Sequence, residues 1–284
     1  MIPSMAHCVV PAAEEILDKE FPVLDKGFVR LVDYLGSDER IVQAARVSYG
    51  KGTKSFREDK GLISYLLRNR HTSPFEQVVF TFHVKLPIFV ARQWIRHRTA
   101  RLNEISGRYS VMKDEFYIPA AGDLAPQSQD NKQGRSEEAL SPEKAGEVQA
   151  LLAAGQKAAY ENYTKLLSDV AKEIARINLP LSLYTEWYWQ IDLHNLLHFL
   201  KLRMDPHAQK EIRLYAEVLY ETVKKVCPAA AEAFEEHQRG AVSFSAKEFA
   251  ALNAKLGGKT DEELGLDEKE LARFKEKLQT GRQV

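Results

Sequence analysis

The chain has 284 residues, 44% of them hydrophobic, and its 40 basic residues balance its 40 acidic residues. This composition suits one large soluble domain with appendages, and the charge balance argues against a general nucleic-acid binder, which usually carries a basic excess. No apolar run approaches the roughly 18 residues of a membrane span, and the first ten residues lack the basic and apolar regions of a signal peptide.

The first quarter of the chain is expected to hold one strand and two helices. Residues 1–25 are predicted to form an N-terminal extension with a helical turn or two before Pro22. The β-formers of residues 27–36 predict a strand, and a helical pattern follows Asp38, with Ser48 just past its end. The apolar face of residues 62–67 predicts a helix that ends near Arg70, because Ser73-Pro74 follows.

The middle of the chain is predicted to contain a strand, a helix, a polar segment and the start of a second helix. Alternation over residues 77–85 predicts a strand, and Pro87 suits the first turn of a helix that runs to about Arg98. Residues 121–141 are polar and aperiodic, which predicts a surface insertion. Ser141-Pro142 then begins a long helix.

The last part of the chain is expected to be mostly helical. A helix over residues 169–177 precedes an alternating strand over residues 182–191. Asp192 caps a helix that ends at Arg203, and Asp205-Pro206 is predicted to cap the next one. Its predicted buried stripe comprises Ile212, Tyr215, Ala216, Leu219 and Val223. Beyond Gly240 a charged tail carries two capping boxes, Ser245-x-x-Glu248 and Thr260-x-x-Glu263.

Cationic side chains concentrate between residues 92 and 110, which contain five arginines, no lysine and one carboxylate, Glu104. Because the arginine fork binds phosphate bidentately and keeps its charge when desolvated, this cluster predicts a phosphate-bearing ligand. No Gly-x-Gly-x-x-Gly follows a strand and no P-loop sequence occurs, so dispersed arginine and histidine side chains would have to hold the phosphates.

The string Arg96-His97-Arg98, seven residues, then Ser106, resembles the signature of the flavin-dependent thymidylate synthases. The likeness continues through Tyr109-Ser110. Three further segments resemble family blocks: Arg46-Val47-Ser48, His71-Thr-Ser-Pro-Phe-Glu76, and the segment from Asp192 through Arg203 to His207-Ala-Gln. Four positions depart from many members, which carry asparagine, arginine, asparagine and serine at the positions of Asp192, His194, His198 and Arg101. Ser73 stands where many have threonine.

This resemblance implies an α+β fold over residues 26–238, with a mixed sheet flanked by long helices. The 121–141 insertion would lie inside it, and the tail at 239–284 would lie outside the resemblance. The implied assembly is a cytoplasmic homotetramer with active sites at subunit interfaces. The implied reaction is the reductive methylation of dUMP to dTMP, with FAD as cofactor and NADPH and methylenetetrahydrofolate as co-substrates.

The resemblance also implies the residues of the site. Arg203 would be catalytic, as a fixed cation that stabilises negative charge developing on the uracil carbonyl. The residues expected to bind dUMP are Gln93, Arg96, Glu104, Ser106, Gly107, Arg108, Arg176 and Arg203. Those expected around FAD are Ser48, His71, Ser73, Glu76, Arg96, His97, Arg98, Thr99, Asn103, Glu104, Asp192, His194, His198, Leu202 and His207.

Several alternatives remain beside this hypothesis. Residues 92–108, with Trp94 and Tyr109 as stacking surfaces, also suit an RNA-binding module. Arg101 is compatible with a flavoprotein of different chemistry. His194 and His198 have a zinc-like spacing, but Asn195 stands where a metalloprotease has its glutamate, so no metal is predicted.

Nucleophilic catalysis through serine or cysteine is not expected. Ser106 has no obvious activating base, and an unactivated serine is a weak nucleophile, so a substrate-binding role is predicted for it. Cys8 and Cys227 lie outside the family-like blocks and lack metal-ligand or redox spacing. Reduced thiols in a cytoplasmic protein are therefore the expectation.

Overall fold

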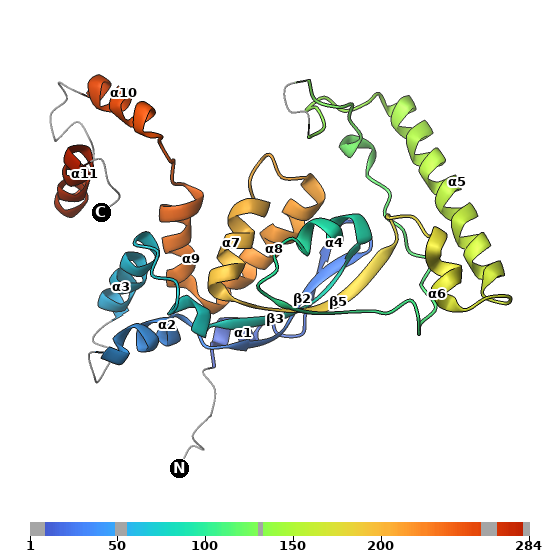
Figure 1. Ribbon diagram of the computed structural model, residues 1–284, viewed down its shortest axis with the longest axis horizontal. Helices are drawn as coiled ribbons and strands as arrows, with labels where there is room; N and C mark the ends of the chain where they lie inside the picture. Colours follow the sequence, from blue (N-terminus) through green and yellow to red (C-terminus); the bar gives the residue numbers. More distant parts are fainter. Residues whose placement is uncertain (1–8, 49–55, 130–132, 257–265, 281–284) are drawn as a thin grey trace, which may run out of the picture.

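A five-stranded sheet forms the centre of the computed structural model (Figure 1). The structure describes residues 9–48, 56–129, 133–256 and 266–280. The strand order is β1-β2-β3-β5-β4, and every neighbouring pair is antiparallel. The bounds are β1 Glu20–Val23, β2 Gly27–Leu35, β3 Val79–Pro87, β4 Arg101–Glu104 and β5 Tyr184–Asp192. The predicted α+β class is confirmed, but the described sheet is antiparallel rather than mixed, because alternation reveals a strand's faces and not its direction.

One face of the sheet is covered by three helices, α4 (Ile88–Trp94), α7 (Leu193–Arg203) and α8 (Lys210–Val226) (Figure 1). Trp94 at the end of α4 packs edge-on against Trp187 and Trp189 of β5, with ring centroids 5.6 and 5.1 Å apart. Its ring also lies 4.7 Å from that of Phe199 on α7. The predicted stripe of α8 is confirmed, since all five of its residues are buried.

The opposite face of the sheet carries polar side chains in register across the strands. His83 of β3 lies between Arg30 of β2 and Tyr188 of β5. Its ring stacks on Tyr188 with centroids 4.9 Å apart, Arg30 approaches its Nδ1 at 3.0 Å, and Glu186 approaches its Nε2 at 3.3 Å. Burial, and then the charge of Arg30, lower the pKa of His83.

Two segments near the arginine cluster differ from expectation. The α4 helix ends at Trp94 instead of Arg98, because residues 95–100 must reverse the chain before β4 pairs with β5. The sequence also predicted a helix that starts directly after Asp205-Pro206, whereas α8 begins at Lys210. Asp205 does not cap α8; its carboxylate accepts from the His207 backbone N–H at 2.8 Å and binds the His207 ring, so it closes a separate turn.

The sequence predictions also missed or misplaced several short elements and one edge strand. Strand β1 lies inside the predicted N-terminal extension, so that segment contributes a strand to the sheet. Strand β3 begins later than predicted because a 3₁₀ turn, η2 (Phe75–Gln77), precedes it. The predicted helix over 169–177 is divided into α6 (Lys172–Ala175) and a 3₁₀ turn, η4 (Arg176–Asn178).

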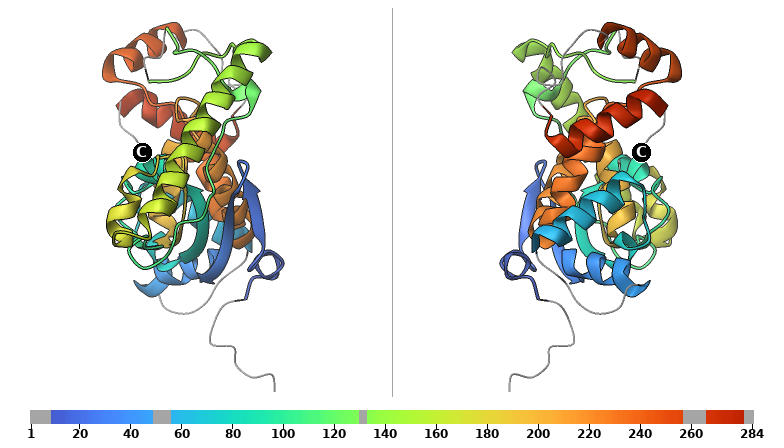
Figure 2. Two further views of the ribbon diagram at one scale, coloured as in Figure 1. Left: turned by 90° about the vertical axis from the view of Figure 1, so that its right-hand side faces the viewer. Right: turned by 90° about the vertical axis from the view of Figure 1, so that its left-hand side faces the viewer.

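The ends of the molecule are formed by helices that do not cover the sheet (Figures 1 and 2). One end carries α5 (Pro142–Leu166) and α6, and the N-cap of α5 is Ser141, as predicted, because its hydroxyl accepts from the Lys144 N–H. The remaining elements are α1 Pro11–Glu14, α2 Asp38–Ala45, η1 Arg46–Ser48, α3 Phe56–Arg68, η3 Ala121–Asp123, α9 Pro228–Phe234, the π-helix η5 Glu235–Arg239, α10 Ala246–Leu256 and α11 Glu268–Thr280. No helix in the described residues is long and apolar enough to cross a membrane.

The tail carries two capping boxes in the described residues. The predicted box at Ser245 is confirmed, since Glu248 N–H donates to the Ser245 hydroxyl and the Ser245 N–H donates to the Glu248 carboxylate. Thr260 lies outside the described residues. The start of α11 is fixed instead by Asp267 and Glu270, which exchange the same pair of bonds.

Asp38 opens α2, but its carboxylate caps a different helix. Its two oxygens accept from the backbone N–H groups of Ala229 at 2.7 Å and Ala230 at 3.0 Å, in the first turn of α9. Carboxylates are favoured at helix N-termini. Burial nevertheless outweighs these bonds and raises the pKa of Asp38 to about 6. The partly buried carboxylate of Asp38 thus joins α2 to α9.

We expect Asp38 to make the free energy of unfolding depend on pH. Since its folded pKa of about 6 lies above its ordinary value of 3.8, the folded state binds the proton more tightly, and stability is lost as pH rises through this interval. Between pH 4 and pH 7 the stability of wild type should fall relative to Asp38→Asn by up to about 3 kcal/mol. Urea unfolding at a series of pH values measures this difference. The control Asp169→Asn, at an exposed aspartate, should keep the wild-type slope; a D38N profile parallel to wild type would refute the assignment.

Candidate functional site

The C-terminal ends of α4 and α7 and the start of α8 bring together four hydrogen-bonded residues, which we term the Arg203 group: Gln93, His97, Arg203 and Gln209. Arg203 Nε donates to His97 Nε2 at 3.0 Å, and its Nη2 donates to the Gln93 carbonyl at 3.4 Å. The Gln93 amide donates to the side-chain oxygen of Gln209. Arg203 lies at the C-terminus of α7, where the helix dipole stabilises a positive charge.

Protonation in the Arg203 group is set by burial and by like charge. Burial, then Arg203 and His198, lower the pKa of His97 to about 4. At neutral pH the imidazole is therefore uncharged, and its Nε2 accepts the Arg203 bond. Burial also lowers the pKa of Arg203, but an arginine remains charged at neutral pH. The group thus holds one fixed cation beside a neutral ring.

The exposed side of α7 extends this group into a longer surface. His194, His198 and Leu202 follow one another at intervals of four residues, so they share one face of the helix, and Leu202 is 46% exposed. The His198 ring lies 5.8 Å from that of His97. The 11 residues of α7 span about 16 Å. Four of the predicted flavin residues therefore lie along one surface: His97, His194, His198 and Leu202.

The N-terminal end of α7 meets the segment that carries the other predicted flavin residues. The backbone N–H of Leu193 donates to the Val78 carbonyl at 2.8 Å, directly after η2. His71, Ser73 and Glu76 are exposed in this segment, and the His71 ring lies 5.9 Å from that of Tyr65. Asp192 caps α7, since its two oxygens accept from the backbone and side chain of Asn195. Ser48 ends η1, and its side chain lies outside the described residues.

A second cluster lies at the loop after β4, and we term it the Arg176 group: Ser106, Gly107, Arg108 and Arg176. Gly107 is buried, and a Cβ there would lie 3.0 Å from the Arg176 side chain, so glycine permits this close approach. Arg108 Nε donates to Glu173 at 2.9 Å, with both side chains about half exposed. Such an exposed pair contributes little stability, so an anionic ligand can replace Glu173 at low cost.

Strand β4 directs neighbouring predicted residues to opposite faces of the sheet. Glu104 accepts from the Thr185 hydroxyl at 2.6 Å on the helix-covered face. Arg101 reaches Gln190 at 3.4 Å on the opposite face, where Asn103 pairs with Tyr188. Asn103 is therefore separated from the α7 surface within one chain, although the resemblance assigned both to FAD.

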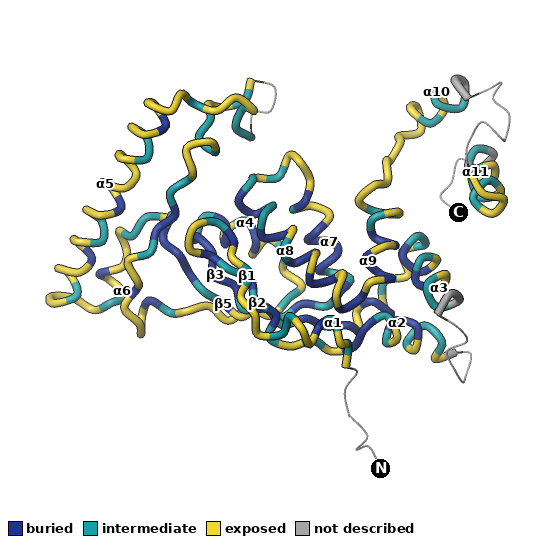
Figure 3. Tube along the Cα trace, turned by 180° about the vertical axis from the view of Figure 1, so that it is seen from behind, coloured by how far each residue is buried: buried dark blue, intermediate teal, exposed yellow. Residues whose placement is uncertain are grey.

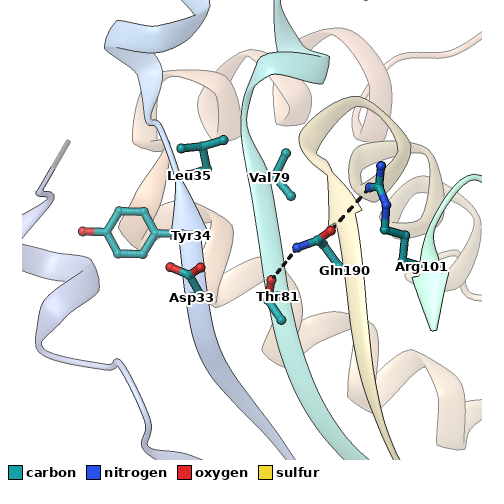
Figure 4. Close-up of a pocket in the computed structure, with 7 residues that line it drawn as sticks. All are labelled: Asp33, Tyr34, Leu35, Val79, Thr81, Arg101 and Gln190. Carbon is teal, nitrogen blue, oxygen red and sulfur yellow. Dashed lines mark hydrogen bonds between the residues drawn. The ribbon is translucent and has the colours of Figure 1, made fainter. Parts of the chain in front are cut away.

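The open face around Arg101 contains a cavity of about 430 Å³ (Figure 4). Its floor is a chain of polar contacts in which Arg101 donates to Gln190 and Gln190 donates to Thr81 at 3.2 Å. Asp33 and Tyr34 of β2 line the other side. This cavity lies on the face of the sheet opposite α4, α7 and α8, so the Arg203 group does not line it.

The arginines next to α4 are the most marked electrostatic feature of the site. Arg92, Arg96 and Arg98 are exposed, and within the described residues no hydrogen bond or ion pair engages their side chains. Thr99 follows these arginines in the sequence and is exposed. His207, which follows α7, is exposed as well, and its ring pairs with the Asp205 carboxylate. Three uncompensated guanidinium groups at the end of α4 favour an anionic ligand.

The structure brings some predicted residues together and separates others. Across the described ranges, no hydrogen bond or ion pair joins the Arg203 group to the Arg176 group. Gln209 and Glu173 were missed as site residues, although Gln209 stood in the His207-Ala-Gln block. In the described part of the chain, no three His, Cys, Asp or Glu side chains gather as a metal site would require.

Comparisons with known proteins match nearly the whole chain. A family model described as "Thymidylate synthase complementing protein" matches residues 30–229, and one described as "Thymidylate synthase ThyX C-terminal domain" matches residues 242–284. The second match corrects the expectation that the tail lies outside the resemblance.

Individual relatives agree with the family models. The flavin-dependent thymidylate synthase of Treponema denticola is 66% identical over 269 residues, which cover 94% of this chain and 100% of the relative. That of Treponema pallidum is 61% identical over 281 residues, covering 99% and 91%. The UMP/dUMP methylase PolB from Streptomyces cacaoi, solved with 5-Br dUMP, superposes with a TM-score of 0.70 at 36% identity, covering 77% of this chain and 99% of that chain.

We expect Arg203→Met to raise the pKa of His97 from about 4 towards 6.5, because it removes a cation that opposes protonation. Burial remains, so the pKa should stay below 6.5. Nitrogen-detected NMR of histidine-labelled protein measures the titration. The control Arg101→Met, on the opposite face of the sheet, should leave His97 unchanged. An unaltered His97 titration in R203M would show that Arg203 does not set its protonation.

Proposed function

Because the chain belongs to the flavin-dependent thymidylate synthase family, we propose that the Arg203 and Arg176 groups form the site at which it methylates dUMP to dTMP. The observation that carries this assignment is the set of uncompensated arginines at the end of α4, beside the Arg203 cation and its neutral His97 partner. A nucleotide monophosphate supplies both an anion for such arginines and a ring whose carbonyl gains charge during reaction.

Each group has a distinct task in this proposal. Arg108 and Arg176 bind the dUMP phosphate, and Arg108 exchanges its exposed Glu173 partner for it. Arg203 is the catalytic cation, held by His97 and the Gln93 carbonyl so that it faces charge developing on the uracil ring. Gln93, Arg96, Glu104, Ser106 and Gly107 complete the nucleotide pocket.

The residues along α7 fit a flavin cofactor. His194, His198 and Leu202 offer ring and apolar contacts over about 12 Å of helix, while Arg96 and Arg98 offer unpaired charge for phosphates. Thr99, Asn103, His207 and the segment with Ser48, His71, Ser73 and Glu76 belong to the same proposed set. Bound FAD supplies the reducing equivalents for the methylation; we propose NADPH as its reductant and methylenetetrahydrofolate as the carbon donor.

We further propose that the site is completed between subunits of a cytoplasmic homotetramer. Two observations support this. The Arg203 and Arg176 groups make no direct contact within the described chain, and Asn103 lies on the other face of the sheet from α7. In addition, much of α5 and of the segment that follows it is exposed (Figure 3), and some of the exposed residues are large and apolar. Leu151, Ile177 and Leu181 are 75%, 74% and 61% exposed, and burying such side chains against a second subunit would be favourable.

We expect Arg176→Met to weaken dUMP binding without removing FAD. A charge-assisted hydrogen bond contributes about 1.5–3 kcal/mol, so the dissociation constant should rise roughly 10- to 150-fold. The measurement is a dUMP titration that follows the flavin absorbance bands. Arg239→Met is the control, since Arg239 is likewise an exposed arginine but belongs to neither group; it pairs with Glu235 at 2.7 Å.

The same titration separates the rival functions. A protein that takes up no FAD but binds oligonucleotides with steep salt dependence would support the RNA-binding alternative. FAD bands that do not respond to dUMP would support a flavoprotein of different chemistry. Flavin bands that shift with dUMP in wild type support the proposed function.

We expect two impaired variants to restore activity when their subunits are mixed and assayed at a dUMP concentration at which each variant alone is nearly inactive. Arg203→Met and Arg176→Met each damage one group, so a mixed assembly contains some sites with two intact groups. Mixing after mild dissociation should recover a measurable fraction of dTMP formation. Adding Ile177→Asp to both variants should prevent the recovery, whereas Val242→Asp, at a side chain that is 73% exposed on the tail, should not. Absence of any recovery in the mixture would indicate a site within one chain.

A further inference from the structure

The polar segment 121–141, which the reaction does not use, is anchored to the start of α8. Arg135 Nη1 donates to the Asp123 carbonyl at 2.6 Å, and Leu140 N–H donates to the Leu124 carbonyl at 2.8 Å. The described part of this segment is therefore closed on itself. It presents Arg135 and Asp123 to the first turn of α8.

Two ion pairs connect the segment to adjacent residues of α8. Arg135 Nη2 contacts Glu211 Oε1 at 3.1 Å, and Lys210 contacts the Asp123 carboxylate. Glu211 is only 3% exposed and also accepts from the Tyr117 hydroxyl at 3.2 Å. Its second oxygen is buried and makes no hydrogen bond in the described structure. A carboxylate so enclosed depends on Arg135 as its charged partner.

The first turn of α8 also fixes the turn that leads to the site. Gln209 is the N-cap residue of α8, and its side chain accepts from Gln93. Arg213 Nη1 donates to the Pro206 carbonyl at 3.0 Å, and Arg213 N–H donates to the Gln209 carbonyl at 3.1 Å. Residues 205–209 are thus held from α8, and whatever holds the start of α8 also holds Gln209.

We propose that Arg135 is a positioning residue for the dUMP site: through Glu211 it fixes the start of α8 and keeps Gln209 against Gln93. The naming of dUMP rests on the proposed function, while the mechanical link does not. A buried ion pair seldom adds net stability over an apolar pair of the same volume, and its best-attested use is to fix register. The Arg135–Glu211 pair has the placement required for that use.

The test compares Arg135→Met with wild type as the complete FAD-loaded protein. We expect the KM for dUMP to rise about tenfold or more while kcat changes less than about threefold, because dUMP loses an oriented contact. FAD content should not change. Hydrogen exchange of the amides in residues 204–212 should become faster. The control Lys144→Met removes a different ion pair, Lys144–Glu147 at 2.6 Å, whose side chains are exposed on α5. It should leave the KM, the FAD content and the exchange rates of residues 204–212 unchanged.

A second pair of variants tests whether Arg135 acts through Gln209. If it does, R135M/Gln209→Ala should raise the KM no more than Q209A alone. Arg135→Lys retains the charge beside Glu211 and should give a smaller rise than R135M; it also serves if R135M does not fold. Additive effects of R135M and Q209A, or an unchanged KM in both Arg135 variants, would overturn the proposal.

The two proposals fail in different ways. If wild type forms no dTMP, the proposed function fails, and the exchange rates of residues 204–212 in R135M and R135K still decide the positioning role. If wild type forms dTMP and those amides exchange at the wild-type rate in both variants, only the positioning role fails.

Discussion

The packing of Trp94 between β5 and α7 is the contact on which the site depends. Trp94 ends α4, and its ring meets Trp187, Trp189 and Phe199 in a buried aromatic cluster. Because interiors are close-packed, this cluster leaves α4 and α7 little freedom to move apart. It therefore fixes the separation of the residues that follow each helix end. His97 and Arg203 meet at 3.0 Å as a consequence of that packing.

The sequence was most informative where a periodic pattern coincided with burial. The stripe of α8, the alternation of β5 and the caps of α5 and α7 were all predicted, because each is set by local spacing against one buried face. The predicted end of α4 and the predicted start of α8 were wrong because contacts with distant parts of the chain set these bounds. Strand β4 must reach β5, and the Asp205 carboxylate is engaged by its own turn. No local pattern encodes these requirements.

The predictions of site residues had the same limit, since a sequence pattern does not show which distant residues come together in the fold. The resemblance named residues that the fold gathers around α7 and residues that it separates, such as Asn103 and Glu104 on opposite faces of β4. Adjacent residues in an extended strand point to opposite faces of the sheet. The sequence named candidate members of the site, and these assignments stay predictions; the fold shows only which of the named residues lie close together within one chain. Glu173 and Gln209 were missed because their roles come only from partners distant in the sequence.

The strand order also has a consequence for how the chain acquires its structure. Strand β4 pairs only with β5 among the described strands, and β5 lies between β3 and β4 although it follows both in the sequence. During synthesis β4 therefore stays unpaired until the ribosome has released β5, which ends at Asp192. Contacts of such long sequence separation slow folding, because the loop-closure entropy is lost before pairing compensates for it. The cationic segment is thus among the last parts of the sheet to be completed.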